Sequence, residues 1–139
     1  MNRRDFQKLT RLRIRDAQAL LKTGRNASGS YYLAGYAVEC AIKSCIARKT
    51  KAGDWSPSPE IARELYSHDL AKLLKQASLN QMLDSAMKTN QKLSDNWIVV
   101  KDWSEQSRYL IKSQVDALLL FNAVTDPQDG VLQWIKQYW

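Results

Sequence analysis

The sequence predicts an all-α protein, a bundle of helices joined by short connections. The first observation is the scarcity of turn residues, with 5 Gly and 3 Pro in 139 residues, whereas all-β sandwiches and barrels need many. The second is that apolar residues recur at helical spacing along most of the chain. The low Gly and Pro content also excludes collagen-like, low-complexity and largely disordered chains. A chain of this length buries roughly two-thirds of its surface, so we expect one domain over residues 1–139.

The first predicted helix covers residues 3–22 and has an apolar side and a basic side. The basic side carries the basic stripe, which we define as Arg4, Lys8, Arg11, Arg15 and Lys22. Residues 1–25 hold eight Lys and Arg and two acidic residues, so most of the net charge of +7 lies here. The stripe is either a solvated face or a binding surface for nucleic acid or an acidic protein. Binding to nucleic acid would weaken steeply with salt, because each neutralised phosphate releases condensed counterions.

Arg13 is out of place in this helix, because its helical angle falls inside the apolar side. A buried Arg needs an acidic partner, and Glu39 is the one acidic residue in the central stretch of the next helix. We therefore predict that Arg13 is buried and pairs with Glu39. On this prediction, Arg13→Ala would cost about 3 kcal/mol or more, because it would leave a buried carboxylate unpaired.

The second predicted helix covers residues 27–48, with Asn26 as its N-cap. It is apolar on nearly every side, which is typical of a helix at the centre of a bundle or in an interface. We therefore expect a homodimer whose apolar interface includes this helix and the aromatic residues near position 139. The few polar groups of the helix share one side, and they are Ser28, Tyr32, Tyr36, Glu39 and Lys43.

Cysteine and histidine are too few and too badly spaced for a metal site. Cys40 and Cys45 point about 140° apart on a helix, so we expect two separate buried thiols. His68 is the single histidine, so no zinc-finger or other Cys/His site is expected. No Gly-rich phosphate loop, no apolar run of membrane-spanning length and no signal-peptide core is present. We therefore expect a cytoplasmic protein with no metal, cofactor or membrane partner.

Shorter elements are predicted for the rest of the chain. Residues 49–58 are interpreted as a loop, and a short helix capped by Ser58 covers residues 59–66. Ser67 or His68 is expected to cap the next helix, and Asn80 the one after it.

Residues 94–109 are interpreted as an extended loop, because a strand there would have no partner. Ser113 and Asp116 resemble a capping box at the start of a helix over 113–124. Asp126 then caps a final helix that reaches residue 139.

Four segments, in their order along the chain, resemble HEPN-domain proteins. Residues 31–43 combine an aromatic, Gly- and Ala-rich face with a Glu and a Lys four residues apart. They are followed by a His-Asp-Leu sequence at 68–70 and by Arg108-Tyr109, which comes soon after Trp103-Ser104. Residues 126–135 are similar to the ending of a small bacterial subgroup. The resemblance covers residues 5–139.

The resemblance implies an antiparallel up-and-down bundle of four to five main helices plus short helices, usually as a homodimer. Some members are metal-independent ribonucleases, often toxins, which bring an Arg and a His together across the dimer with four to six residues between them. Others bind nucleotides or RNA, and many of these are encoded beside a minimal nucleotidyltransferase. We expect the second kind, a nucleotide- or RNA-binding module, with a minimal nucleotidyltransferase as its candidate partner in a toxin–antitoxin-like system.

The nuclease alternative depends on Arg63 and His68, whose spacing fits the ribonuclease motif. A His can move a proton from a 2′-hydroxyl, and an Arg can hold the phosphate. In the ribonucleases, however, the motif belongs to a later helix, and here Arg108 has no His after it.

A third alternative is a helical protein-interaction module that docks an acidic partner on its first helix. The candidate nucleotide- or RNA-binding residues are Tyr32, Tyr36, Glu39, Lys43, His68, Arg108 and Tyr109. Glu39 and Lys43 are either a structural ion pair or one wall of a polar pocket.

Overall fold

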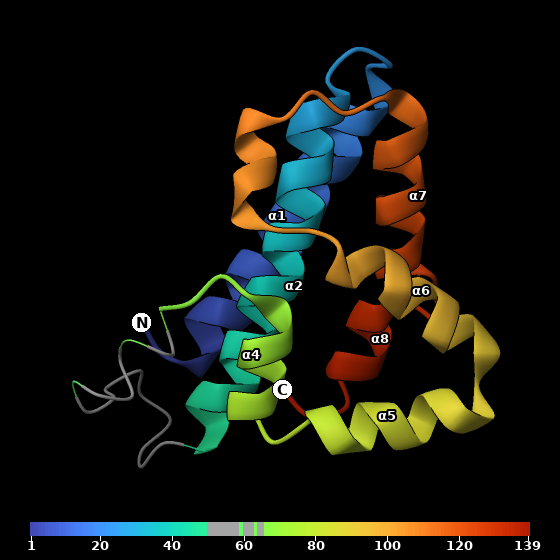
Figure 1. Ribbon diagram of the computed structural model, residues 1–139. Coiled ribbons are helices and arrows are strands. Elements are labelled where there is room, and N and C mark those ends of the chain that lie inside the picture. The colour runs from blue at the N-terminus through green and yellow to red at the C-terminus, as the bar shows by residue number, and fades with distance from the viewer. Residues whose placement is uncertain (50–58, 60–62, 64–65) are drawn as a thin grey trace.

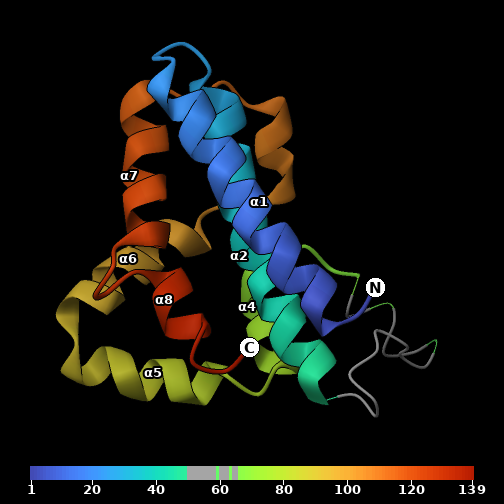
Figure 2. The same ribbon diagram turned by 180° about the vertical axis from the view of Figure 1, so that it is seen from behind.

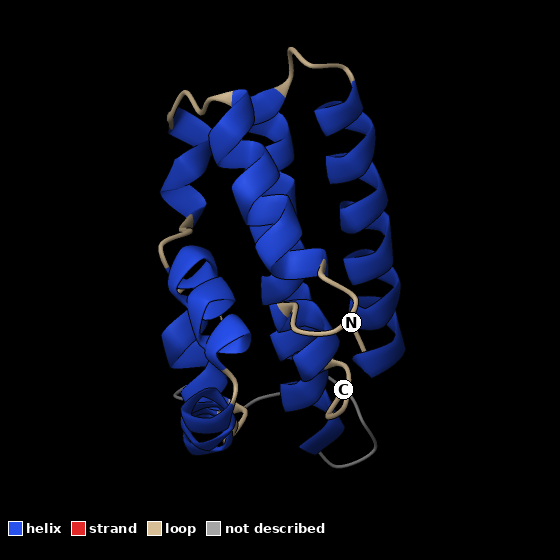
Figure 3. Cartoon of the chain, turned by 90° about the vertical axis from the view of Figure 1, so that its right-hand side faces the viewer, coloured by secondary structure: helices blue, strands red, loops and turns tan. Residues whose placement is uncertain are grey.

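The structure is a computed structural model that describes residues 1–49, 59, 63 and 66–139. Every regular element in this part is a helix (Figure 3), so the predicted all-α class is confirmed for the described residues. The elements are α1 (Arg3–Lys22), α2 (Ala27–Lys49), α4 (Leu70–Gln76), α5 (Asn80–Thr89), α6 (Gln91–Lys101), the 3-10 helix η2 (Glu105–Tyr109), α7 (Gln114–Thr125) and α8 (Val131–Ile135). Apart from Lys49, which belongs to α2, the predicted loop over 49–58 lies outside the described residues, as does most of the predicted helix over 59–66.

The long helix α2 lies at the centre of the molecule. α1 runs antiparallel to it on one side, and α7 descends on another (Figures 1 and 2). α4, η2 and α8 also contact α2, while α5 crosses the lower end of the molecule. The surroundings explain why α2 is so uniformly apolar, because helices cover it on nearly every side. Its continuous burial from Ala37 to Ala47 confirms that it is a central helix.

α2 is largely covered within a single chain, so it leaves little apolar surface for a second copy. Trp134 near the C-terminus is also buried, and Tyr138 and Trp139 pack against the main core. These segments therefore leave less exposed apolar surface for a dimer interface than the sequence suggested. The sequence does not show this, because the number of helices that surround α2 depends on the tertiary arrangement.

The predicted pairing of Arg13 with Glu39 is also wrong. The Arg13 side chain is 30% exposed, and its Nε lies 3.0 Å from Oδ2 of Asp16, one turn further along α1. A long Arg side chain can lay its methylene groups on apolar surface while its charged end reaches the edge of the helix. The position that looked buried by helical angle is therefore a boundary position, and Glu39 has other partners.

Most of residues 94–109 lie in helices, in α6 up to Lys101 and in η2 from Glu105, where an extended loop was predicted. α6 begins after Asn90, whose side-chain oxygen accepts a hydrogen bond from the Leu93 amide at 3.1 Å. Leu93, Trp97 and Val100 then follow at helical spacing and are all buried. Their burial outweighs the β preference of the Ile-Val-Val run, which reflects packing on a sheet more than an intrinsic backbone preference.

Several predicted helix caps differ from those observed, although the helices themselves are present. Asp69 caps α4, and its Oδ1 accepts a hydrogen bond from the Lys72 amide at 3.0 Å, while Ser67 and His68 precede it. Leu79, and not Asn80, precedes α5, and Gly130 precedes α8. α8 ends at Ile135, before the predicted residue 139. Asp126 accepts hydrogen bonds from two amides of the turn before α8. The predicted capping box of Ser113 and Asp116 is confirmed at the start of α7.

The two cysteines are free and buried, as predicted. Burial raises the pKa of the Cys40 thiol to about 12 and that of Cys45 to about 11. The Tyr36 hydroxyl donates to Cys40, and burial also raises the pKa of Tyr36 to about 12.

Alkaline pH is therefore expected to destabilise the protein. In the unfolded chain these thiols ionise near their ordinary pKa of 9.0, whereas in the folded chain they stay neutral. The unfolded state binds fewer protons above that pKa, so the free energy of unfolding should fall as pH rises from about 9 towards 12. Urea titrations under reducing conditions over this range measure the slope, and Cys40→Ala should make it shallower. A slope unchanged by Cys40→Ala would contradict the assignment.

Candidate functional site

A buried carboxylate on α2 is the centre of the candidate site. Glu39 is only 1% exposed. Lys43 lies one turn further along the same side of the helix, and its Nζ is 2.7 Å from Glu39 Oε1. His68 approaches from the segment before α4 and places Nδ1 3.0 Å from both carboxylate oxygens. The carboxylate thus has partners from two separate segments of the chain.

The network continues from His68 to η2. His68 Nε2 lies 3.2 Å from Glu105 Oε2, and Arg108 Nη2 lies 3.8 Å from the same oxygen. A continuous series of ionisable side chains therefore runs from Lys43 to Arg108. It brings together three of the four segments on which the family resemblance rests, although they are far apart in the sequence.

The position of His68 limits what its imidazole can do. Each ring nitrogen faces a carboxylate, Nδ1 towards Glu39 and Nε2 towards Glu105. Neither nitrogen therefore offers a free lone pair to a substrate proton in this arrangement. Glu105 is the more exposed of the two carboxylates, so Nε2 is the nitrogen that a ligand could reach by displacing a neighbour.

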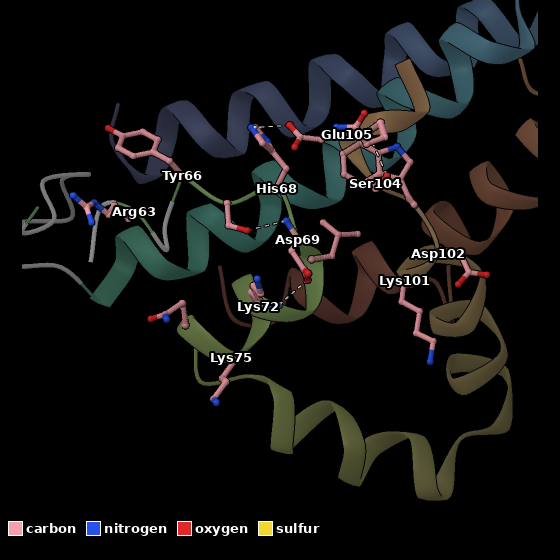
Figure 4. A pocket seen from close by; sticks show the side chains of 15 residues that line it. Arg63, Tyr66, His68, Asp69, Lys72, Lys75, Lys101, Asp102, Ser104 and Glu105 are labelled. Carbon is pink, nitrogen blue, oxygen red and sulfur yellow. Dashed lines mark hydrogen bonds and ion pairs between the residues drawn. The ribbon is translucent and has the colours of Figure 1, made fainter. Parts of the chain in front are cut away.

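A groove of about 950 Å³ opens beside His68, between α4 and the corner where α6 leads into η2 (Figure 4). Its lining includes an exposed tyrosine, Tyr66. Both residues of the nuclease alternative, Arg63 and His68, lie on this lining. In Figure 4, Lys75 on α4 and Lys101 on α6 come from opposite walls. The charged lining residues besides His68 are Arg63, Lys72, Lys75, Lys101, Asp69, Asp102 and Glu105.

Aromatic rings form a layer between the groove and α2. Trp103 lines the groove and is 3% exposed. The Tyr32 ring stacks on it with centroids 6.1 Å apart, and Tyr36 stacks on Tyr32 at the same distance. Gly35 lets this layer approach α2, because a Cβ built there would lie 2.2 Å from Trp103 ring atoms. Tyr32 and Tyr36 thus support the wall through Trp103.

Tyr32 and Tyr36 belong to the aromatic stack on Trp103, and the structure places the other predicted binding residues in three groups. His68 lies on the groove. Glu39 and Lys43 are buried on α2 as an ion pair next to it, as the structural interpretation expected. Arg108 and Tyr109 are exposed at the end of η2, where the Arg108 guanidinium lies 5.2 Å from the Tyr109 ring centroid.

The lysines of the groove were missed by sequence reasoning. Lys72 and Lys75 are three residues apart on the exposed side of α4, opposite its buried leucines, and this pattern was available in the sequence. Lys101 was not predicted, because the residues of α6 from 94 onwards were interpreted as a loop. The sequence therefore did not indicate that Lys101, the last residue of α6, would face α4.

The basic stripe lies on α1, outside the groove lining. All five of its side chains are exposed, as predicted. Near its middle, the Arg11 guanidinium lies 5.1 Å from the ring centroid of Trp139.

Comparisons of the chain with protein-family models, with curated proteins and with solved structures find no match. Among the described residues, no helix is long and apolar enough to cross a membrane, and no group of three or more His, Cys, Asp or Glu residues is placed to hold a metal ion.

Proposed function

We propose that this chain is a HEPN-like module that binds the phosphates of a nucleotide or of RNA in the groove beside His68. The observation that carries the proposal is the convergence of basic side chains from separate elements on one groove, namely Arg63, Lys72, Lys75 and Lys101. The meeting of the three resembling segments at Glu39, His68 and Arg108 supports the family assignment.

The balance of charge in the groove favours an anionic ligand. Three carboxylates also line it, but two of them have partners. Asp69 accepts the hydrogen bond that caps α4, and Glu105 faces both His68 and Arg108. The lysines have no acidic partner within the described residues. Phosphate oxygens suit such a site because charge-assisted hydrogen bonds to them are strong, and the exposed Tyr66 adds a ring on which a base can stack.

The double replacement Lys72→Gln/Lys101→Gln should weaken nucleotide binding about ten-fold or more, because it removes cations from two walls of the groove. Isothermal titration with adenosine triphosphate and with a short RNA measures the change. The matched control is Lys88→Gln/Lys92→Gln, which removes two exposed lysines from α5 and α6 away from the groove. Equal affinities in the two double variants would contradict the proposal.

A second candidate function is cleavage of RNA by Arg63 and His68. It is favoured by the position of both residues on the same groove. It requires His68 Nε2 to exchange Glu105 for a substrate hydroxyl, and a 2′-hydroxyl would be the nucleophile. An RNA cleavage assay in EDTA tests it, and cleavage that disappears in His68→Gln but persists in Lys88→Gln would establish this alternative.

We also propose that the protein is a homodimer, and we now place the interface on α7. The outer side of α7 and the segment before it carry six large apolar side chains between 47% and 97% exposed, which we call the apolar face: Tyr109, Leu110, Ile111, Val115, Leu118 and Leu119. Contiguous apolar patches of this kind on soluble proteins mark interaction sites. A second copy that packs the same face against it would cover both patches in one isologous contact.

A homodimer should have a mass near 32 kDa, twice the 16.0 kDa of one chain, and light scattering measures this mass. Replacing Leu118 and Leu119 with Glu should give the monomer mass, because two charges would be buried in the interface. The circular dichroism of this variant should be unchanged, since both positions are exposed in the single chain. A wild-type mass of 16 kDa at micromolar concentration would refute the dimer and leave the apolar face for a different partner, such as a nucleotidyltransferase.

A further inference from the structure

The basic stripe is unusually uniform for an exposed helix side. At about 100° per residue its five cations fall within about 60° of arc. The acidic residues of α1, Asp5 and Asp16, both fall outside this arc. No ion pair neutralises any of the five within the described part of the chain. Successive cations at positions 4, 8, 11 and 15 are about 4.5–6 Å apart along the helix axis, so they form a row of positive charge.

An aromatic ring lies beside this row. Trp139 is partly buried, and two cations approach its ring, Arg11 at 5.1 Å and Lys136 at 5.5 Å from the ring centroid. Its position is held by the backbone, because Arg3 donates to the Trp139 carbonyl at 2.5 Å and Arg48 donates to the Tyr138 carbonyl at 3.1 Å. These bonds hold the Trp139 backbone beside α1, and the ring lies next to the middle of the stripe.

A row of cations beside an aromatic ring is a suitable binding surface for single-stranded nucleic acid. Proteins that bind single strands combine a basic surface for the backbone with aromatic side chains on which bases stack. A duplex offers phosphates but no unstacked base, so it would use the cations without the ring. An acidic protein surface would likewise gain nothing specific from an indole.

We propose that the α1 stripe and Trp139 form a second nucleic-acid contact surface, which binds a single strand with its phosphates on Arg4, Lys8 and Arg15 and one base stacked on Trp139. The Arg11 and Lys136 side chains turn from the ring to the phosphates as the base arrives. This inference extends the proposed function from a nucleotide bound in the groove to a longer single strand. The two proposals concern the same class of ligand but different surfaces of the protein.

The test compares Trp139→Leu with Trp139→Phe. Binding is measured by fluorescence anisotropy with a labelled oligouridylate and with a labelled RNA duplex of the same length. Trp139→Leu should weaken single-strand binding about five-fold or more and leave duplex binding within about two-fold, because only the stacked base is lost. Trp139→Phe should retain most of the affinity. Equal single-strand affinity of Trp139→Leu and wild type would overturn the proposal, and so would an equal loss on duplex and single strand.

A second variant covers the possibility that Trp139→Leu disturbs folding. Lys8→Gln/Arg15→Gln changes only exposed side chains. It should reduce the slope of log affinity against log salt by about 1.4 for a single strand, because two phosphate contacts are lost. Lys88→Gln/Lys92→Gln is the control of equal charge and should leave the slope unchanged. A stripe variant with the wild-type slope would also overturn the proposal.

The same measurements in the Lys72→Gln/Lys101→Gln background separate this proposal from the proposed function. If the groove binds no nucleotide, the Trp139 effect on oligouridylate should still be present in that background. If the groove binds nucleotide but Trp139→Leu has no effect, the further inference alone is wrong.

Discussion

Replacing Lys43 with Ala is expected to destabilise the protein by about 3–5 kcal/mol, the usual cost of removing one partner of a buried ion pair. Lys43 is the closest partner of Glu39, at 2.7 Å, and Glu39 is almost completely buried on the central helix. Without the ammonium group the carboxylate keeps, among the residues that the structure describes, only His68 as a partner, and the side chain of His68 is 41% exposed. Thermal unfolding should show a fall in Tm on the order of 10 °C.

The control for this prediction removes both charges together. The variant Glu39→Gln/Lys43→Met keeps the approximate side-chain volumes and leaves no buried charge on α2, so it should be more stable than Lys43→Ala. Arg13→Ala should cost no more than about 1 kcal/mol, because its pair with Asp16 is partly exposed to solvent. If Arg13→Ala proved as damaging as Lys43→Ala, the assignment of partners to Glu39 would be wrong.

Gly35→Ala is the second change with a large expected effect. The added Cβ would lie 2.2 Å from carbon atoms of the Trp103 ring, closer than any real contact allows. The indole is buried and belongs to the main core, so it cannot swing aside as a flexible side chain would. Overpacking of this kind costs about 1–3 kcal/mol or more, and it exceeds the gain of roughly 1 kcal/mol from replacing Gly by Ala in a helix. Because Trp103 also lines the groove, nucleotide affinity should fall as well.

Gly29 on the same helix provides the matched control. A Cβ there would meet only the end of the Leu20 side chain, at 3.2 Å, and a small rotation of that side chain relieves the contact. Gly29→Ala should therefore be neutral or slightly stabilising in urea denaturation. Equal stability of the two alanine variants would show that Trp103 does not pack on Gly35 as described.

Local patterns in the sequence predicted the long elements well, for reasons visible in the structure. α1 begins and ends at the predicted residues, because its apolar side repeats over five turns and Asn2 caps it with Asp5. α2 differs from the prediction by one residue at its end. The capping box at Ser113 placed the start of α7 to within one residue. Each of these signals is contained within a few turns of helix.

The errors concern interactions between segments distant in the sequence. Arg13 and Glu39 were expected to pair between two helices, but each has a closer partner within its own helix, Asp16 for Arg13 and Lys43 for Glu39. Lys101 entered the candidate site only because α6 ends at the groove. The apolar face was not predicted, because the sequence of α7 is apolar on nearly every side. Only the tertiary structure shows which side of α7 other helices cover and which side stays exposed.

The groove itself is tested most directly by a nuclear magnetic resonance titration of the ¹⁵N-labelled protein with adenosine triphosphate and, separately, with a short RNA. The account predicts saturable shifts of amides in residues 66–76 and 101–106, which line or adjoin the groove, and little change at the exposed positions Lys88 and Lys92. The shifts should be lost in Lys72→Gln/Lys101→Gln. Absence of shifts at these amides at millimolar ligand, or shifts that persist in the double variant, would contradict the central claim that this groove binds nucleotide phosphates.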